Sequence, residues 1–274
     1  MIDKPNPWNK PKRIKFQDGP CQIPAIKKTQ IVTIIEFKKV TFFNIKDNEI
    51  SSLFNIDGLF VFPSGPNLSE MRIGSEYHLS LKKADYVFFD SGFFVLLLKL
   101  FKGISVNKVS GYKFLNHFFR YISKNKNKSI FCIDPDIKTS NINKKFLNKL
   151  GVKKVNSYVA PIYNEYNFND KKLLKLTSLK KADYILTNIG GGKQEVLGRY
   201  LKKNLKYKTS IFCTGGAISY FTGHQAPINN FFDKFYLGWL IRILFNPRIF
   251  LIRYLKSFKL LFVIIFSNIR VLKK

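Results

Sequence analysis

The chain has 274 residues, of which 46% are hydrophobic, so it can bury a substantial core and is not a disordered tail. It carries 47 Lys and Arg against 17 Asp and Glu, a net charge of +30, which favours anionic partners such as a lipid surface, nucleic acid or sugar nucleotides. The abundant Lys, Asn, Ile and Phe also fit an AT-rich coding sequence, so the placement of the charge tells more than its total.

Cysteine spacing and apolar run lengths restrict the class of protein. Cys21, Cys132 and Cys213 are odd in number and far apart, which argues against a disulfide framework or a zinc site and fits a reducing cytoplasm. Residues 1–22 lack the apolar stretch of a secretory signal. The longest apolar run near the C-terminus, Leu260 to Phe266, is far shorter than the ~18 residues of a spanning helix.

Residues 1–30 are predicted to form an irregular basic extension. They contain five prolines, and proline fixes φ and lacks a backbone donor: Pro5, Pro7, Pro11, Pro20 and Pro24. We expect an α/β core over residues 31–225 and a basic, amphipathic helical appendage over residues 226–274.

Short apolar runs between longer helical patterns indicate the fold class of the core. The runs are typical of buried parallel strands, at residues 59–63, 86–89, 130–133, 155–159, 184–187 and 210–213. The helical patterns cover residues 68–83, 93–102, 114–123, 143–150, 171–181 and 193–204. This alternation predicts a doubly wound, Rossmann-like and mostly parallel sheet flanked by helices.

After Cys213 the strand pattern stops, and two helical stretches are expected at residues 233–245 and 247–265. Asn246 and Pro247 separate them as an N-cap and first-turn pair. The tail therefore differs in composition from the core.

Polar and glycine residues follow the predicted strands, where an open parallel sheet binds its ligands. They are Ser64-Gly65-Pro66-Asn67, Asp90-Ser91-Gly92, Asp134-Pro135, Gly190 to Glu195 and Thr214-Gly215-Gly216. We expect one edge of the sheet to collect them.

The triple glycine Gly190 to Gly192 lies between a strand and a helix start, where backbone N–H groups can hold an anion. It matches no nucleotide fingerprint, because Gln194 follows Lys193 where a Walker loop has Ser or Thr, and the dinucleotide pattern lacks its third Gly. A phosphate loop and a plain tight turn are both open interpretations.

Asp90 follows a predicted apolar strand and precedes Ser91 and Gly92. A carboxylate in this position can act as general base on a sugar hydroxyl. The alternative is an N-cap for the helix that begins near Phe93.

Several motifs in order carry a family resemblance. Asn188-Ile-Gly-Gly-Gly-Lys-Gln-Glu195 is followed by Gly215-Gly216-Ala217, Phe221-Thr-Gly223, Ala226-Pro227, Leu237-Gly-Trp-Leu-Ile-Arg242, Asn246-Pro-Arg248 and Arg253-Tyr254. From about Leu59 to Tyr254, the chain resembles the WecG/TagA/CpsF glycosyltransferases, which transfer a sugar from a nucleotide donor to a lipid-linked acceptor at the bacterial cytoplasmic membrane.

The resemblance implies a hexosyltransferase of surface polysaccharide or exopolysaccharide biosynthesis that uses no cofactor and a polyprenyl diphosphate-linked acceptor. The segment from Ala84 to Gly92 is similar to the family segment with the proposed catalytic aspartate, which falls on Asp90. We expect Asp90 to act as general base in an inverting transfer, with Gln194 positioning donor or acceptor.

Cations and N–H groups are expected to bind the donor diphosphate, because no metal-ligand cluster is visible in the sequence. The expected donor, probable only as far as the family implies it, is UDP-linked. The candidate donor-binding residues are Ser64, Asn67, Lys108, Gly111, Gly190, Gly191, Gly192, Lys193, Glu195, Gly215, Arg242 and Arg248.

Departures from the family pattern predict a divergent branch with a different donor. Ser64-Gly-Pro-Asn67 stands where Thr-x-Asn is usual, Lys108 stands for an Arg, and Lys113 stands for an acidic residue. Gly238 and Asn246 replace two Glu residues of the family's C-terminal ion pairs.

The predicted helix after Pro247 has basic residues on one side and apolar residues on the other, which is typical of an interfacial helix. Arg253, Lys256 and Lys259 are therefore expected to meet an anionic membrane. We expect a peripheral protein on the cytoplasmic face of the bacterial inner membrane. An ordinary helix packed on its own domain is the alternative.

Two other functions remain alternatives. The charge and the 16% aromatic content also fit a nucleic-acid-binding protein, although no recognition motif is present and no nucleic acid is expected as partner. The substitutions at Lys108, Lys113 and Gly238 also fit an inactive, scaffolding relative. A homo-oligomer is possible within either function, and His78, His117 and His224 share no ligand spacing.

Overall fold

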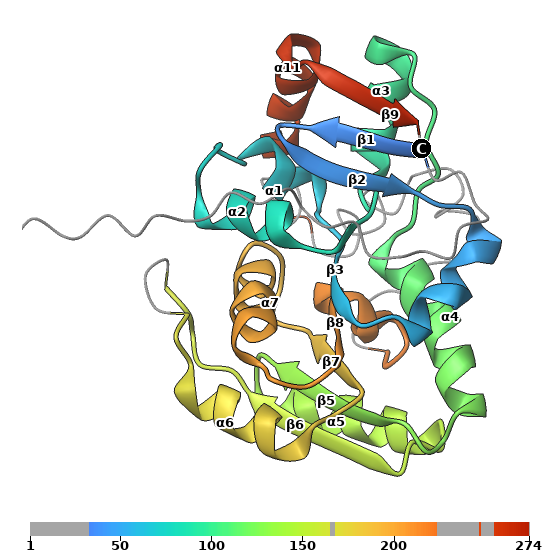
Figure 1. The fold of residues 1–274 in the computed structure, drawn as a ribbon, viewed down its shortest axis with the longest axis vertical. Helices are drawn as coiled ribbons and strands as arrows, with labels where there is room; N and C mark the ends of the chain where they lie inside the picture. The colour runs from blue at the N-terminus through green and yellow to red at the C-terminus, as the bar shows by residue number, and fades with distance from the viewer. Residues whose placement is uncertain (1–32, 165–167, 224–246, 248–254, 274) are drawn as a thin grey trace, which may run out of the picture.

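Six parallel strands form the main sheet of the computed structural model, which describes residues 33–164, 168–223, 247 and 255–273 (Figure 1). The strands are β3 (Gly58–Val61), β4 (Tyr86–Val87), β5 (Ser129–Asp134), β6 (Lys154–Val159), β7 (Tyr184–Thr187) and β8 (Ser210–Cys213). They lie in the order β4-β3-β8-β7-β5-β6, and every neighbouring pair is parallel. All six strands predicted from the apolar runs are confirmed.

Helices connect these strands, as parallel neighbours require. They are α1 (Gly65–Ser69), α2 (Glu76–Lys83), α3 (Gly92–Lys102), α4 (Gly111–Lys124), α5 (Ile137–Lys149), α6 (Lys171–Lys180) and α7 (Lys193–Asn204). One prediction is wrong: the helix expected over residues 68–83 is two helices. The break contains Gly74, whose φ of 88° does not fit an α-helix.

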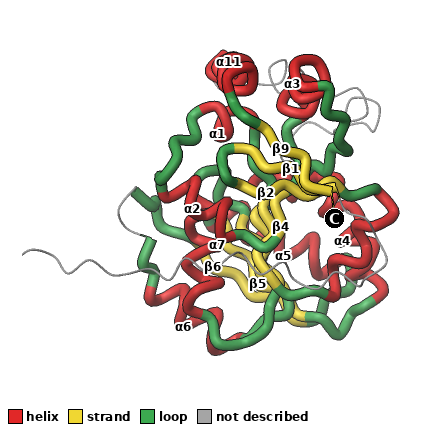
Figure 2. The backbone as a smooth tube through the Cα atoms, turned by 45° about the horizontal axis from the view of Figure 1, so that its top comes forward, coloured by secondary structure: helices red, strands yellow, loops and turns green. Residues whose placement is uncertain are grey.

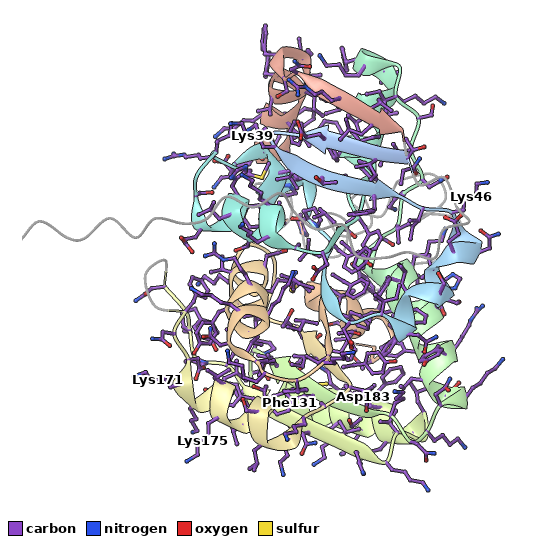
Figure 3. The ribbon with its side chains drawn as sticks, in the orientation of Figure 1. Lys39, Lys46, Phe131, Lys171, Lys175 and Asp183 are labelled. Carbon is purple, nitrogen blue, oxygen red and sulfur yellow. The ribbon has the colours of Figure 1, made fainter. Side chains whose placement is uncertain are left out.

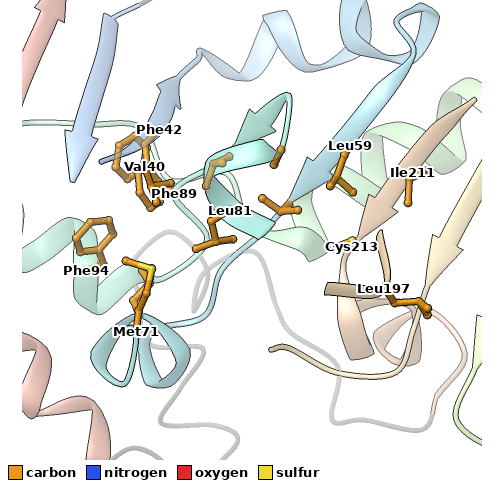
Figure 4. Close-up of a cluster of buried hydrophobic side chains, with 14 of the residues drawn as sticks. Val40, Phe42, Leu59, Met71, Leu81, Phe89, Phe94, Leu197, Ile211 and Cys213 are labelled. Atoms are coloured by element: carbon orange, nitrogen blue, oxygen red, sulfur yellow. The ribbon is translucent and has the colours of Figure 1, made fainter. Parts of the chain in front are cut away.

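Successive residues of the buried strands feed two separate cores, because strand side chains alternate between the faces of a sheet. Leu59 and Val61 pack with Leu197 of α7 in one cluster, part of which Figure 4 shows. Phe60 and Phe62 pack with Phe114 of α4 in the other. Figure 2 shows the strands between α2, α6 and α7 on one side and α4 on the other.

A second sheet has the order β2-β1-β9, with β1 (Thr33–Phe37), β2 (Val40–Asn44) and β9 (Ile269–Lys273). Its strands are antiparallel, and Thr33 pairs with both Asn44 and Lys273. The expectation that strands stop after Cys213 is therefore wrong. The pairing of β9 with β1 joins residues from opposite ends of the chain, which a local pattern cannot indicate. A bridge between Phe43 and Phe88 connects this sheet to the main one.

The described part of the tail contains helix α11 (Lys259–Phe266), preceded by a helical turn at residues 255–257. Leu260 and Ile264 are fully buried in the first core cluster, and α11 contacts α1 and α3. The helix therefore packs on its own domain along one side. The extension over residues 1–30 and the helix expected over residues 233–245 lie outside the described residues.

Aromatic side chains fill the core more than they cover the surface. Phe114 and Phe212 meet edge to face with ring centroids 4.9 Å apart, and Phe60 lies edge to face with Phe212 at 5.2 Å. Lysines lie outside: Lys171 and Lys175 of α6 point away from the body of the molecule (Figure 3). Cys132 and Cys213 are buried free thiols, and no helix in the described ranges is long and apolar enough to cross a membrane.

Candidate active site

The carboxyl ends of four neighbouring strands bring the predicted polar segments to one edge of the main sheet. β4 leads to Asp90, β3 to Ser64, β8 to Thr214 and β7 to the glycine loop at Gly190, and the strands are adjacent in the order β4-β3-β8-β7. The expectation that one edge collects these segments is confirmed for this set.

The glycine loop has a backbone shape that other residues rarely adopt. Gly190 and Gly192 have φ of 91° and 92°. A Cβ on Gly191 would clash with the side-chain amide of Asn67. All three glycines therefore have a conformational or steric reason, and the loop ends at the N-terminus of α7, where N–H groups can meet an anion.

Glu195 holds the loop from inside. Its side chain is fully buried, and Oε2 accepts a hydrogen bond from Gly192 N–H at 2.6 Å. Burial raises the pKa of Glu195 to about 7, although hydrogen bonds to the carboxylate, including that of Gln194, oppose the rise. The carboxylate thus supports the loop from beneath, rather than lying exposed beside it.

Gln194 joins the start of α7 to the end of β8. Its Nε2 donates to Cys213 O at 3.1 Å and to Glu195 Oε1 at 3.2 Å. Its Oε1 is buried without a hydrogen-bond partner, which leaves one acceptor for a ligand.

Asp90 is half-buried, and its Oδ1 accepts a hydrogen bond from Gly111 N–H at 2.8 Å. The N-cap of α3 is Ser91, whose Oγ accepts from Phe94 N–H at 3.2 Å. The alternative role of Asp90 as N-cap is therefore wrong, and another explanation is needed for a carboxylate at this edge. Its charge also raises the pKa of Glu195 and Tyr77, after the larger effect of burial, which places Asp90 in their neighbourhood.

Buried polar atoms without a hydrogen-bond partner gather at the same edge. Five of the nine such atoms in the described residues belong to Ser64, Asn67, Tyr77, Gln194 and Thr214. An unpaired buried polar group costs about 1–3 kcal/mol. Their concentration at the strand ends is typical of a site that a polar ligand completes.

A pocket of about 470 Å³ opens beside this cluster. Its lining comes from the α1 region, the glycine loop and the turn before α11: Pro66, Asn67, Glu70, Ile189, Gly190, Gly191, Lys193 and Lys256. Two ammonium groups and a glycine loop around one cavity suit a phosphate-bearing ligand. Glu70 adds a carboxylate, which Lys259 pairs at 2.9 Å.

Other predicted site residues lie nearby or elsewhere. Lys108 is half-buried on the segment that leads to Gly111, and Gly215 follows β8 with its Cα close to Gln194. Lys256 lines the pocket and Lys259 pairs with Glu70, so both face the α1 side of the tail. Arg242, Arg248 and Arg253 lie outside the described residues.

Asp134 belongs to a structural network at the neighbouring strand end. It is fully buried, and its Oδ1 accepts from the amides of Asn143 at 2.7 Å and Asn188 at 2.8 Å. Burial raises the pKa of Asp134. The network links α5 and the end of β7 to β5.

Sequence patterns missed Tyr77 and Glu70. Tyr77 lies on α2, and burial raises the pKa of its hydroxyl well above the usual value. Its only sequence signal is an aromatic at a helical position, which is also typical of core. His78 and His117 are structural: His78 Nε2 contacts Lys38 O at 2.8 Å, and His117 contacts Asp47 at 3.2 Å.

Comparisons with known proteins complete the description of the site. Across the described ranges, no group of three or more His, Cys, Asp or Glu could hold a metal ion. The model of the glycosyl transferase WecG/TagA/CpsF family matches residues 36–274, which covers the α/β core, the glycine loop and the tail. No curated protein matches the chain.

Proposed function

The chain belongs to the WecG/TagA/CpsF glycosyltransferase family, a family of polysaccharide biosynthesis, and we propose that it moves a hexose from a nucleotide-sugar donor, UDP-linked, to a polyprenyl diphosphate-linked acceptor. The observation that carries the proposal is the cluster of unpaired buried polar atoms beside the glycine-loop pocket. A core built only for stability would pair these atoms or exclude them.

The donor diphosphate binds in the pocket under this proposal. The backbone of Gly190 to Gly192 and the ammonium groups of Lys193 and Lys256 are suited to its negative charge. Ser64 and Asn67 offer a hydroxyl and an amide, each with a buried atom that lacks a partner. These groups would recognise the donor without a metal ion.

Asp90 acts as general base in the transfer step. The acceptor hydroxyl gives its proton to the Asp90 carboxylate while its oxygen forms a bond to the anomeric carbon of the donor. The bond from that carbon to the phosphate oxygen breaks, and the nucleoside diphosphate leaves with the electron pair. Attack opposite the leaving group inverts the anomeric centre. The hydrogen bond from Gly111 N–H holds one carboxylate oxygen of Asp90 and leaves the other for the acceptor.

The acceptor requires the protein to work at a membrane, and we place it at the cytoplasmic face of the bacterial inner membrane as a peripheral protein. Donor synthesis in the cytoplasm and a lipid-linked acceptor both fit this location. The two alternatives have less support: large aromatic side chains fill the cores rather than a stacking surface, and a scaffold would not need unpaired polar atoms around a pocket.

The test is a transfer assay with purified protein, UDP-, GDP- and dTDP-sugars and a polyprenyl diphosphate-linked acceptor. Asp90→Asn is expected to lower kcat about 10²–10⁴-fold, the usual contribution of general base catalysis. Asp57→Asn is the matched control, because Asp57 is exposed at the opposite end of β3. Full transfer by Asp90→Asn would show that another group takes the proton.

A further inference from the structure

Large apolar side chains are exposed at one end of the molecule. Eight of the fifteen exposed large hydrophobic residues in the described ranges lie on α3 or on residues 255–266. We call them the apolar end: Leu96, Leu100, Phe101, Leu255, Phe258, Phe262, Ile265 and Phe266. Exposed apolar groups gathered in one place are typical of an interaction surface.

Two helices lie side by side to form the apolar end. The rings of Phe93 and Phe258, near the start of each stretch, have centroids 5.8 Å apart. Near the other end, Lys102 Nζ donates to Ile265 O at 3.0 Å. The helices therefore run in the same direction, and both figures of the backbone place α3 and α11 at one end of the molecule (Figures 1 and 2).

The inward side of α11 is already satisfied. Leu260 and Ile264 are fully buried against the core, whereas Phe262 and Phe266 are 62% and 84% exposed. The same division holds on α3, where Leu98 is buried and Leu100 is 64% exposed. Each helix thus has one apolar side for the core and a second apolar side that the described chain does not cover.

The charge around the apolar end has one sign. Lys99 and Lys102 lie on α3, and Lys256 and Lys259 lie on the turn and first residue of α11. The sequence contains no Asp or Glu over residues 91–133 or 234–274. Aromatic and aliphatic side chains flanked by lysines suit the boundary between acyl chains and anionic headgroups.

We propose that α3 of the catalytic core and α11 together form one lipid-binding face, which inserts its apolar side chains into an anionic monolayer. The occupant is a lipid surface rather than a second copy of the chain, because a second copy would bring the same lysines against each other. This goes beyond a tail that alone contacts the membrane: a helix of the core is itself an anchor.

The position of α3 gives this face a consequence for the proposed function, on which this step rests. α3 begins at Gly92, two residues after Asp90. A membrane that binds along α3 and α11 would meet the molecule next to the proposed general base. A lipid-linked acceptor could then reach Asp90 while its lipid remains in the bilayer.

The experiment is sedimentation of the full chain with phosphatidylcholine vesicles, with and without phosphatidylglycerol, in the absence of donor and acceptor. The variant Leu100→Ser/Phe101→Ser alters α3 alone. Ile137→Ser/Leu179→Ser is the matched control, because these side chains are 66% and 72% exposed on α5 and α6. All four residues are surface residues, and circular dichroism melting will show whether each variant folds.

The expected result is a vesicle partition coefficient about tenfold lower for the α3 variant, since several CH₂ groups and a ring no longer enter the lipid, and an unchanged value for the control. Lys99→Gln/Lys102→Gln should weaken binding to the anionic vesicles and leave the weak binding to neutral vesicles unchanged.

Equal binding by the wild type and the α3 variant would overturn the proposal. So would a wild type that forms dimers in sedimentation equilibrium, ignores vesicles and becomes monomeric in the α3 variant. Vesicle binding without sugar transfer would count against the proposed function alone, whereas transfer with no loss of vesicle binding in the α3 variant would count against the lipid face alone.

Discussion

The carboxyl edge of the main sheet and the apolar end of α3 and α11 are incomplete in opposite ways. At the sheet edge, polar atoms of residues such as Asn67 and Gln194 are buried without partners. At the apolar end, side chains such as Phe262 and Phe266 remain in water. Each arrangement is unfavourable in the isolated protein, so each gains free energy when its own kind of partner binds.

The comparison separates the contributions of the tail. Lys256 lines the pocket, and Ser257 lies near Gly65 of α1, whereas Phe262 and Phe266 face away. One segment thus contributes to both regions through different residues. Variants of single side chains can therefore affect one region and leave the other intact.

The largest effect on stability is expected from the buried carboxylate beneath the glycine loop. A pKa raised from 4.5 to about 7 means that ionised Glu195 destabilises the fold by about 3 kcal/mol. The native protein binds more protons than the unfolded chain in this range, so stability falls as pH rises from about 4.5 to above 7. Glu195→Gln removes this fall.

Urea unfolding of the wild type and Glu195→Gln at pH 5 and pH 8 measures the difference. We expect the variant to gain relative to the wild type at pH 8. Parallel pH profiles would show that Glu195 stays ionised in the fold, and would leave the sheet edge more polar than described.

The next effect concerns donor affinity. Lys256→Ala should raise the Kd of the nucleotide sugar about tenfold to a hundredfold, since a charge-assisted hydrogen bond contributes about 1.5–3 kcal/mol. Isothermal titration of the donor measures it. An unchanged Kd would assign Lys256 to the membrane face instead of the pocket.

A smaller effect is expected at the close approach in the glycine loop. Gly191→Ala places a methyl group against the Asn67 amide and should cost about 1–3 kcal/mol of stability. The double variant Gly191→Ala/Asn67→Ala removes the clash and should recover most of that loss. Thermal unfolding of both proteins tests this, and equal losses would mean that the loop has room.

The smallest effect is expected for the exposed ion pair between Lys259 and Glu70. Both side chains are largely exposed, at 64% and 49%, so Lys259→Met should change the free energy of unfolding by less than about 1 kcal/mol. The donor Kd should also stay close to the wild-type value, in contrast to Lys256→Ala. A loss comparable to that of Lys256→Ala would extend the pocket to Lys259.

Local patterns predicted the region around the sheet edge well. β7 and α7 have the predicted bounds, because an apolar run, a glycine loop and a helix with Glu195 at its third position are all encoded within some twenty residues. Asp90 and the glycine loop were found in the same way. Tyr77 was missed because an aromatic on a helix carries no sign of which neighbours will surround it.

Long-range packing was not predictable from the same patterns. β9 pairs with β1 across nearly the whole chain, and its five residues give no local reason to end the helical tail. A helical projection placed Lys256 and Lys259 on a basic side, but it could not show that α1 would face that side. The apolar sequence of α3 was equally silent on how much of the helix the core would cover.

Donor binding tests the central claim most directly, because the sheet edge is described as a site that a nucleotide sugar completes. The measurement is the thermal unfolding midpoint of the wild type, Gly191→Ala and Asp57→Asn with UDP-, GDP- and dTDP-sugars. One donor class should raise the Tm of the wild type and Asp57→Asn and give little or no rise in Gly191→Ala. No rise with any donor, or the same rise in all three proteins, would contradict a donor site at the glycine loop.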